Sequence, residues 1–177
     1  MFFDLLETRR SIRQFKETPV EKEKIDRILE SALRSPSSRS FNPWQFIVVD
    51  QKELLDSLCR AKPHGAGFLK SAPLAIVVCA DTSASDVWVE DCSIASIFIH
   101  LAAHALGLGS CWIQIRKRDY DQTKSADSFI KDTLGIPDPF TVESIIAIGY
   151  PDEAKKGHER ASLDYDKIFY NGFGSKE

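Results

Sequence analysis

Residues Cys92–Cys111 lie in the longest stretch of this chain without a charged side chain, and any fold has to bury them. A membrane span needs about 20 predominantly apolar residues, whereas this stretch is interrupted by serines, histidines and glycines: Ser93, Ser96, His100, His104, Gly107, Gly109 and Ser110. Asp86 is expected to cap a helix here, and Glu90 and Asp91 favour its first turns. Gly107 is expected to end it. The sequence therefore predicts a buried core helix that also forms part of a subunit interface.

Length, charge and the N-terminus bound the possible classes. The chain has 177 residues, 43% of them hydrophobic, which favours a single domain over residues 1–177 with a sizeable core. The net charge is −3, without a long basic run, so neither nucleic acid nor a membrane surface is an expected partner. Residues 1–7 contain no positively charged leader before an apolar stretch. No secretory signal is expected, and a cytoplasmic location follows by default.

The cysteines and histidines do not form a pattern typical of a metal site. The four cysteines are widely spaced and lack a C-x-x-C pair: Cys59, Cys79, Cys92 and Cys111. Reduced, mostly buried thiols are expected. His100 and His104 are one helical turn apart, but no glutamate lies between them and no third ligand is evident. We expect structural histidines and no metal.

The rest of the chain alternates predicted helices and strands. Helical periodicity covers three ranges: Glu21–Leu33, Gln51–Ala61 and Ser125–Leu134. Gly135 and Pro137 are expected to end the third helix. Beta-branched and aromatic residues predict four strands: Gln45–Val49, Leu74–Cys79, Cys111–Ile115 and Glu143–Ile148. This alternation also allows a parallel α/β sheet, so periodicity alone does not decide the topology.

Three arginines and a serine lie close together near the N-terminus. A helical turn would place Arg9 and Arg13 on the same side, because residues four apart face the same way, whereas Arg10 would point elsewhere. Arginine presents a planar fork of donors that matches phosphate oxygens, and Ser11 adds a compact donor. The cluster therefore predicts a site for a phosphate-bearing ligand. Alternatively, Phe2–Thr8 form a short amphipathic helix whose negative end the arginines complement while facing water.

A polar loop follows the first long helix. That helix is expected to end near Arg34, because a residue before proline avoids the helical region and Ser35 precedes Pro36. Short hydroxyl side chains and backbone amides in the loop can donate to heteroatoms of a flat ring. The residues concerned are Ser37, Ser38 and Ser40. An ordinary surface loop would have the same composition.

A Gly-x-Gly pattern occurs in His64–Gly67, but it precedes the Leu74–Cys79 strand and lacks a third glycine. A dinucleotide fingerprint needs the strand first and a helix N-terminus afterwards. We therefore reject a Rossmann-type site.

Five segments, taken in order, resemble those of the nitroreductase family, flavin enzymes in which paired subunits build two shared active sites. They are Thr8–Arg13, Pro36–Trp44, Ala72–Pro73, Leu106–Trp112 and Ile148–Pro151. The resemblance runs from Glu7 to about Tyr170. Ser40 and Asn42 depart from the family's usual Pro-Ser-x-x-Asn-x-Gln-Pro-Trp pattern.

The resemblance implies an α+β, nitroreductase-like sandwich with a mainly antiparallel central sheet flanked by helices. It also implies a homodimer with FMN sites at the subunit interface. The C-terminal extension, about residues 160–177, would wrap the partner subunit, because Leu163–Tyr170 is too apolar for a solvated tail.

The resemblance also implies roles for individual residues. One subunit would hold the FMN phosphate, ribityl chain and ring edge through Arg9, Arg10, Ser11, Arg13 and Arg160. The other subunit would approach the same flavin with Pro36, Ser37, Ser38 and Ser40. His64 aligns with a position at the pyrimidine edge, although a surface histidine is an equal alternative. Gln114 and Ile115 align with residues near flavin N5, where many relatives have Glu-Gly. His158 replaces a common lysine, for which Lys155 and Lys156 could compensate.

The implied function is an FMN-dependent NAD(P)H oxidoreductase. NADH or NADPH would reduce FMN, and a nitroaromatic, a quinone or a similar small-molecule acceptor would then be reduced at the same place, in a ping-pong mechanism. FMN carries the chemistry, so no catalytic amino acid is expected. Two alternatives remain: a non-catalytic FMN-binding storage, sensor or interaction protein, and a specialised flavin oxidase, dehydrogenase or dehalogenase on the same scaffold.

Overall fold

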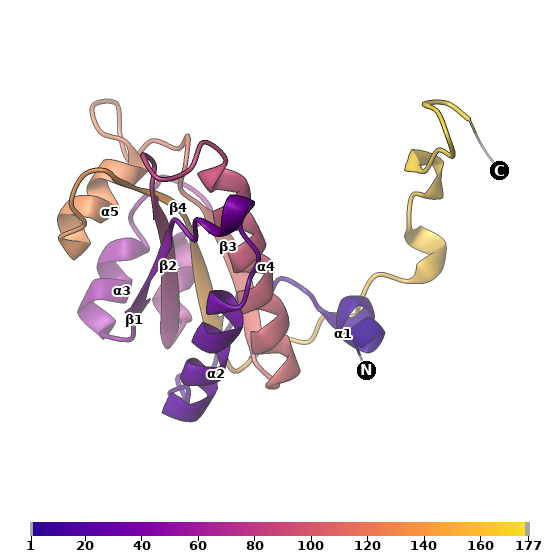
Figure 1. Ribbon diagram of the computed structural model, residues 1–177. Helices are drawn as coiled ribbons and strands as arrows, with labels where there is room; N and C mark the ends of the chain where they lie inside the picture. The colour runs from indigo at the N-terminus through magenta and orange to yellow at the C-terminus, as the bar shows by residue number, and fades with distance from the viewer. Residues whose placement is uncertain (1, 176–177) are drawn as a thin grey trace.

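A four-stranded antiparallel sheet organises the computed structural model, which describes residues 2–175 (Figure 1). Its strands lie in the order β1-β2-β4-β3. Their bounds are Trp44–Val49 for β1, Leu74–Asp81 for β2, Gly109–Gln114 for β3 and Phe140–Gly149 for β4. All three pairings are antiparallel, which confirms the predicted α+β class. The parallel alternative was wrong.

Helices cover both faces of the sheet. The helices α2 (Lys22–Leu33) and α4 (Trp88–Ala105) pack on one face, whereas α3 (Lys52–Leu58) and α5 (Ala126–Leu134) pack on the other (Figure 1). Successive side chains of a strand point to opposite faces, so the two central strands, β2 and β4, contribute to two hydrophobic layers. Ile145 belongs to the layer under α3 and α5, and Ile146 to the layer under α2 and α4.

The predicted core helix is α4, and its C-terminal end follows the prediction. Gly107 adopts a left-handed φ of 77°. The Leu108 N–H donates to Ala103 O at 2.9 Å, and the Gly107 N–H donates to His104 O at 3.0 Å. These two bonds form a Schellman motif, in which a glycine without a Cβ closes the helix.

The other end of α4 differs from the prediction. Val87 occupies the N-cap position and makes no side-chain cap bond, while Asp86 pairs with Arg39 at 3.0 Å. The predicted Asp86 cap was therefore wrong. α4 is also not wholly covered, because Ile94 and Ile97 are 36% and 44% exposed. No described helix combines the length and apolar character needed to cross a membrane.

Helix and strand boundaries mostly agree with the sequence. Ser125 caps α5 by accepting from the Ser128 N–H, and Gly135 ends this helix with a φ of 68°, as predicted. The predicted helix over Gln51–Ala61 is shorter in the structure. β3 begins at Gly109 and stops before Ile115.

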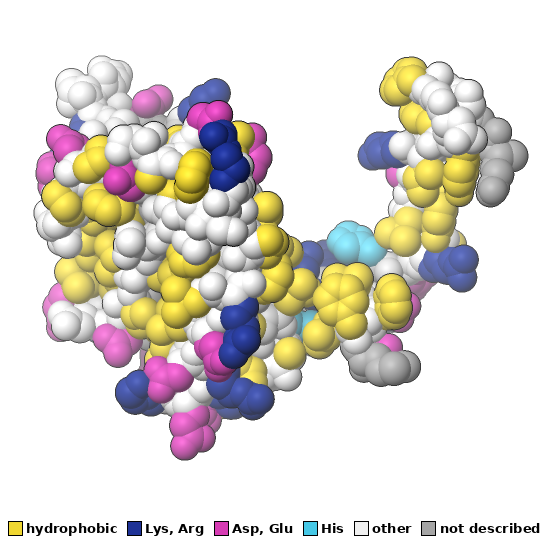
Figure 2. All heavy atoms as spheres, in the orientation of Figure 1, with side chains coloured by type: hydrophobic (Ala, Val, Ile, Leu, Met, Phe, Trp, Pro, Cys, Tyr) yellow, Lys and Arg dark blue, Asp and Glu magenta, His cyan; other side chains and the backbone are white. Residues whose placement is uncertain are grey.

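The helix α1 (Phe2–Thr8) and the last part of the chain project from this body (Figure 1). We call residues 160–175 the arm, which contains only two short 3-10 helices, Arg160–Ser162 and Tyr165–Lys167. Hydrophobic side chains lie along both projections (Figure 2). Phe3 is 71% exposed and Phe173 is 96% exposed. The predicted C-terminal extension also included residues 176–177, which lie outside the described part.

Candidate functional site

The arginine segment is extended, so the predicted helical turn was wrong. α1 ends at Thr8. Beyond it, Ser11 pairs in parallel with Ser110, and the Ile12 N–H donates to Ser110 O at 3.0 Å. In an extended chain alternate side chains point to opposite sides. Ile12 is buried, so Ser11 and Arg13 face away from the core along the outer edge of β3.

The chain returns from β4 and runs beside this segment. The Lys155 Nζ donates to Ser11 O at 2.9 Å, and Arg10 donates to Lys156 O. A Cβ added to Gly157 would lie 1.8 Å from Glu7 O, so only glycine allows this approach. The return segment therefore fixes the backbone on which the predicted phosphate donors lie.

Positive charge concentrates around Ser11 and Cys111. Burial raises the pKa of the Cys111 thiol, while Arg13, Ser11 and Lys155 oppose this rise. Burial and the nearby Arg118 lower the pKa of Lys62. These side chains place several cations and one carboxylate, Glu153, near Ser11 and Cys111; Glu153 pairs with Lys155 at 2.9 Å. The excess of cations suits a phosphate group.

Sequence reasoning missed Lys62 and Arg118 as members of this cluster. They come from two loops that are distant in sequence, and only the fold brings them together. No local spacing pattern could have identified them.

The two helix histidines each bond to a neighbour at this end of α4. His100 Nδ1 lies 2.7 Å from Ser110 Oγ, and His104 Nε2 lies 2.8 Å from Thr8 Oγ1. Burial, with a smaller contribution from Arg9, lowers the pKa of His100 to about 4. His100 is therefore neutral at pH 7 and acts as part of the protein interior.

The serine loop lies at the opposite end of α4. The Ser38 N–H donates to the buried Asp91 carboxylate at 2.7 Å. The Ser37 hydroxyl donates to Asn42 Oδ1 at 2.7 Å and accepts from the Asn42 N–H at 2.9 Å. These groups are thus engaged within their own subunit, while Pro36 and Ser40 remain exposed. Left-handed backbone occurs at three residues of the loop: Arg39, Ser40 and Asn42.

The two groups of predicted site residues are held at separate places. The loop is attached at Asp91, and the arginine segment follows Thr8, which contacts His104. Asp91 and His104 are therefore about 20 Å apart along α4, because an α-helix rises about 1.5 Å per residue. A hollow of about 570 Å³ opens between Pro19, Lys52 and Pro73, but no predicted site residue lines it. The two groups of predicted site residues therefore do not come together within one chain.

The end of β3 separates Gln114 from Ile115. Ile115 is fully buried, and its N–H donates to Glu143 O at 3.2 Å. In an antiparallel edge strand, neighbouring residues direct their backbone groups to opposite sides. Because Ser110 O faces the outer edge and the Ile115 N–H faces β4, the Gln114 N–H points to the outer edge. Gln114 can thus offer a backbone donor, whereas Ile115 cannot.

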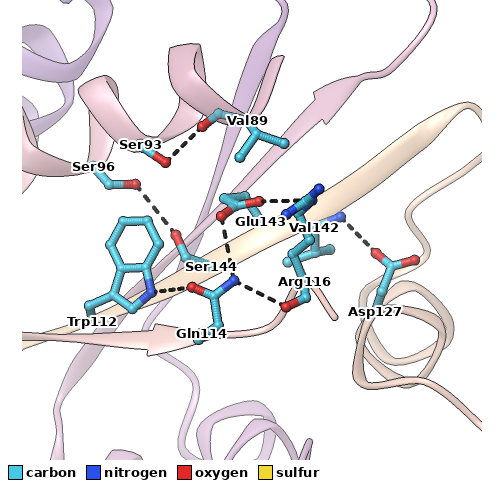
Figure 3. Close-up of polar contacts among 10 residues, drawn as sticks. All are labelled: Val89, Ser93, Ser96, Trp112, Gln114, Arg116, Asp127, Val142, Glu143 and Ser144. Carbon is cyan, nitrogen blue, oxygen red and sulfur yellow. Dashed lines mark hydrogen bonds and ion pairs between the residues drawn. The ribbon is translucent and has the colours of Figure 1, made fainter. Parts of the chain in front are cut away.

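The Gln114 side chain belongs to a polar network on the α4 side of the sheet (Figure 3). Its Oε1 accepts from Trp112 Nε1 at 2.9 Å, and its Nε2 donates to Arg116 O at 3.1 Å. Burial raises the pKa of the neighbouring Glu143 carboxyl.

The remaining predicted residues lie on exposed segments. His64 is exposed on a loop before the 3-10 helix Gly67–Ser71, whose Phe68 lies under Arg13, with 5.8 Å from Cζ to the ring centroid. This loop is therefore close to the arginine segment. Arg160 lies on the arm, where its Nε donates to Tyr165 OH at 3.4 Å. Within residues 2–175, no hydrogen bond links Arg160 to the segment that carries Arg9 and Arg13.

Comparison with known proteins gives one consistent result. Residues 6–150 match the nitroreductase family. An FMN-dependent nitroreductase structure from Clostridium difficile R20291 is 52% identical, covers 97% of this chain and 99% of its own, and superposes with a TM-score of 0.95.

Two archaeal relatives, provisionally named NADH dehydrogenase/NAD(P)H nitroreductase, agree with this result. The protein from Methanothermobacter thermautotrophicus is 41% identical, over 93% of this chain and 84% of its own. The protein from Archaeoglobus fulgidus is 39% identical, over 88% of each chain. The match to the family covers most of the body, and the fold agrees over nearly the whole chain. This protein therefore belongs to the nitroreductase family, as its sequence predicted.

Proposed function

We propose that this protein is a homodimeric, FMN-dependent NAD(P)H oxidoreductase. The observation that carries the proposal is the cation cluster beside the outward N–H of Gln114, because it offers a phosphate site and a ring-edge donor along one edge of β3. The 52% identical structure named as an FMN-dependent nitroreductase supports the cofactor. The names of the archaeal relatives support NADH or NADPH as co-substrate.

The residues present fit FMN by the chemistry of their donors. Arginine forks and a serine hydroxyl match a phosphate, and Lys155 adds a further cation next to Ser11. The proposed phosphate and ribityl ligands are Arg9, Arg10, Ser11, Arg13 and Arg160. His64, on the loop close to Arg13, is proposed at the pyrimidine edge. Gln114 offers its backbone N–H to the ring, whereas Ile115 only supports the strand end from the core.

Bound FMN would supply the redox chemistry of a ping-pong reaction between NADH or NADPH and a nitroaromatic, a quinone or a similar acceptor. The protein orients the ring and stabilises charge through fixed donors. No amino acid side chain is proposed as a catalytic acid, base or nucleophile.

The partner subunit completes each site. Apolar side chains on α1, on α4 and on the arm are exposed in one chain, and burying them between two chains is favourable. The wide separation of the arginine segment and the serine loop along α4 fits two shared sites. We assign Pro36, Ser37, Ser38 and Ser40 to the neighbour's flavin. Pro36 and Ser40 offer exposed surface, whereas the Ser37 hydroxyl and the Ser38 N–H hold the loop in shape through bonds within their own chain. The domain is single, over residues 1–177, with the arm wrapping the partner.

A visible spectrum of the purified protein, followed by anaerobic addition of NADH and of NADPH, tests the activity. We expect stoichiometric FMN that is bleached by at least one nicotinamide, and parallel double-reciprocal lines with an acceptor. Bound FMN that neither nicotinamide bleaches would instead favour a storage, sensor or interaction protein. Reduction followed by turnover with oxygen or a halogenated substrate alone would favour the specialised oxidase or dehalogenase.

Equilibrium sedimentation tests the assembly. Deleting the chain from Leu163 onward should weaken both the dimer and FMN retention, because binding that depends on association depends on protein concentration. A monomer that keeps stoichiometric FMN would contradict the shared-site arrangement and the role of the serine loop.

A further inference from the structure

A β-bulge in β4 gives the sheet an unusual residue on its α4 side. Val78 of β2 pairs with Ser144, whereas the next residue, Cys79, pairs with Val142, so Glu143 is the extra residue. The bulge changes the direction of the side chains that follow. Val142 belongs to the layer under α3 and α5, while Glu143 and Ser144 both reach partners on the α4 side. The bulge therefore aims a carboxyl at a place where regular alternation would not put one.

Glu143 bonds to three consecutive residues at the end of β3. Its backbone oxygen accepts from the N–H groups of Ile115 at 3.2 Å and Arg116 at 3.1 Å. Its side-chain Oε1 accepts from Gln114 Nε2 at 3.5 Å (Figure 3). The strand end is thus held by both the main chain and the side chain of one residue.

The Gln114 amide has only one orientation that satisfies its neighbours. An indole N–H is a donor and never an acceptor, so the atom facing Trp112 Nε1 at 2.9 Å has to be Oε1. Nε2 then faces two acceptors, Arg116 O and Glu143 Oε1. Removing either acceptor would leave an N–H without its partner, which is costly in a poorly hydrated place.

Burying the Glu143 carboxyl costs desolvation free energy, and the packing of the sheet does not require a carboxyl at this position. Glu143 is 3% exposed, and its Oε2 lacks a hydrogen-bond partner within the described chain. The nearest cation, Arg116, is 3.9 Å away and lies over Trp88, so it compensates the charge only partly. Glu90 adds a like charge from α4. Downstream positions of the same strand carry apolar side chains, including Ile145 and Ile146, and an apolar residue here would avoid this desolvation.

We propose that Glu143 is a positioning residue that holds the Gln114 amide, and with it keeps the outward backbone N–H of Gln114 fixed at the outer edge of β3. The inference rests on the proposed function, in which this N–H faces the reacting edge of the flavin. A donor is most effective when it is held in place before reaction. The buried carboxyl is therefore retained for the geometry of Gln114 and contributes no bond to substrate.

Three variants separate positioning from general stability. Glu143→Leu removes the acceptor, Glu143→Gln keeps a carbonyl acceptor but removes the charge, and Ser144→Ala is the matched control. Ser144 is buried next to Glu143 and its backbone pairs with Gln114, but its side chain contacts Ser96 and makes no hydrogen bond to Gln114, so the alanine variant leaves the strand pairing in place. The readouts are hydrogen exchange of the Gln114 side-chain amide by NMR, FMN affinity, and the rate of anaerobic flavin reduction by NADH and NADPH.

We expect Glu143→Leu to accelerate Gln114 amide exchange and to slow flavin reduction by about tenfold, as suits the loss of one hydrogen bond, with a smaller change in FMN affinity. Glu143→Gln should restore most of both properties, and Ser144→Ala should match the wild type. If Glu143→Leu does not fold, Gln114→Leu removes the other partner and should slow reduction equally.

Unchanged Gln114 exchange in Glu143→Leu would overturn this inference, as would equal losses in all three variants. Equal slowing in Glu143→Gln and Glu143→Leu would also overturn it, because the charge and not the acceptor would then matter. If Glu143→Leu does not fold, a wild-type reduction rate in Gln114→Leu would overturn it. A wild-type protein that binds no FMN, or that neither nicotinamide reduces, would instead overturn the proposed function.

Discussion

The body of the molecule and the arm use apolar side chains in opposite ways. In the body, β2 and β4 are covered on both faces, and Leu74 is only 1% exposed. On the arm, Leu163 is 49% exposed and Phe173 is 96% exposed. Burying apolar surface is what offsets the entropy of ordering a chain. The body thus covers its own apolar side chains, whereas the arm leaves apolar side chains exposed, as the proposed dimer requires.

The largest expected effect concerns the cofactor contacts of the body. Charge-assisted hydrogen bonds contribute about 1.5–3 kcal/mol each, so Arg9→Ala/Arg13→Ala should weaken FMN binding by roughly a hundredfold or more. The backbone of this segment is already ordered against Ser110 and Glu153, so little ordering entropy offsets the loss. Flavin titration monitored by fluorescence measures the affinity, with circular dichroism to check the fold. Wild-type affinity in the double variant would remove the arginine segment from the site.

A matched pair of leucines tests the contrast in packing directly. Leu74→Ala should cost about 2–5 kcal/mol of unfolding free energy, because a buried leucine leaves a cavity. Leu163→Ala should cost less than about 0.5 kcal/mol in dilute monomer, as an exposed substitution does. Urea denaturation over a range of protein concentrations gives both values. Equal costs at the lowest concentration would mean that the arm is packed without a partner.

Protonation of His100 should destabilise the body at mildly acidic pH. The folded-state pKa is about 4, below the ordinary value of about 6.5, so the stabilisation is present above pH 6.5 and is lost as pH falls towards 4. The expected loss is roughly 1–2 kcal/mol between pH 6.5 and 5. Urea midpoints across this range should fall less steeply in His100→Gln. A wild-type slope in His100→Gln would contradict the assignment.

The smaller of the two expected effects on FMN binding is that of Arg160 on the arm. Its guanidinium is exposed and contacts only Tyr165 OH among the described groups, so ordering it on a ligand costs entropy that the body arginines do not lose. Arg160→Ala should weaken FMN binding by about 1 kcal/mol, or roughly fivefold. The same titration as for the arginine pair measures it. A loss as large as that of Arg9→Ala/Arg13→Ala would show that the arm is held as firmly as the body.

Local signals in the sequence predicted the helices and strands well. Ser125 and Gly135 bound α5 because a side-chain cap and a left-handed glycine act within a few residues of the helix ends. The helical turn proposed for Arg9–Arg13 failed because β3 offers the segment an edge to pair with. Asp86 failed as a cap because Arg39, distant in sequence, takes its carboxylate. In both cases, a contact with a residue distant in sequence determined the local structure.

The site could be predicted only in part. Arg9, Ser11 and Arg13 were predicted, and are still proposed, as phosphate ligands because their residue types match a phosphate wherever the backbone places them. The contributions of Lys62 and Arg118 depend on how loops meet, and the role of Glu143 depends on a bulge that shifts the pairing of β4 with β2. The pattern of apolar and polar residues in β4 does not reveal that Glu143 is an extra residue.

Gly157 lies so close to Glu7 that the position of α1 and the path of the return segment depend on each other. With a Cβ position only 1.8 Å from Glu7 O, any side chain at 157 would push α1 away from the return segment, and the arm that follows would lose its starting direction. α1 and the arm are therefore aimed as a pair. In the proposed dimer, the second chain would therefore meet one surface built from both projections, and the residue that sets the orientation of this surface has no side chain.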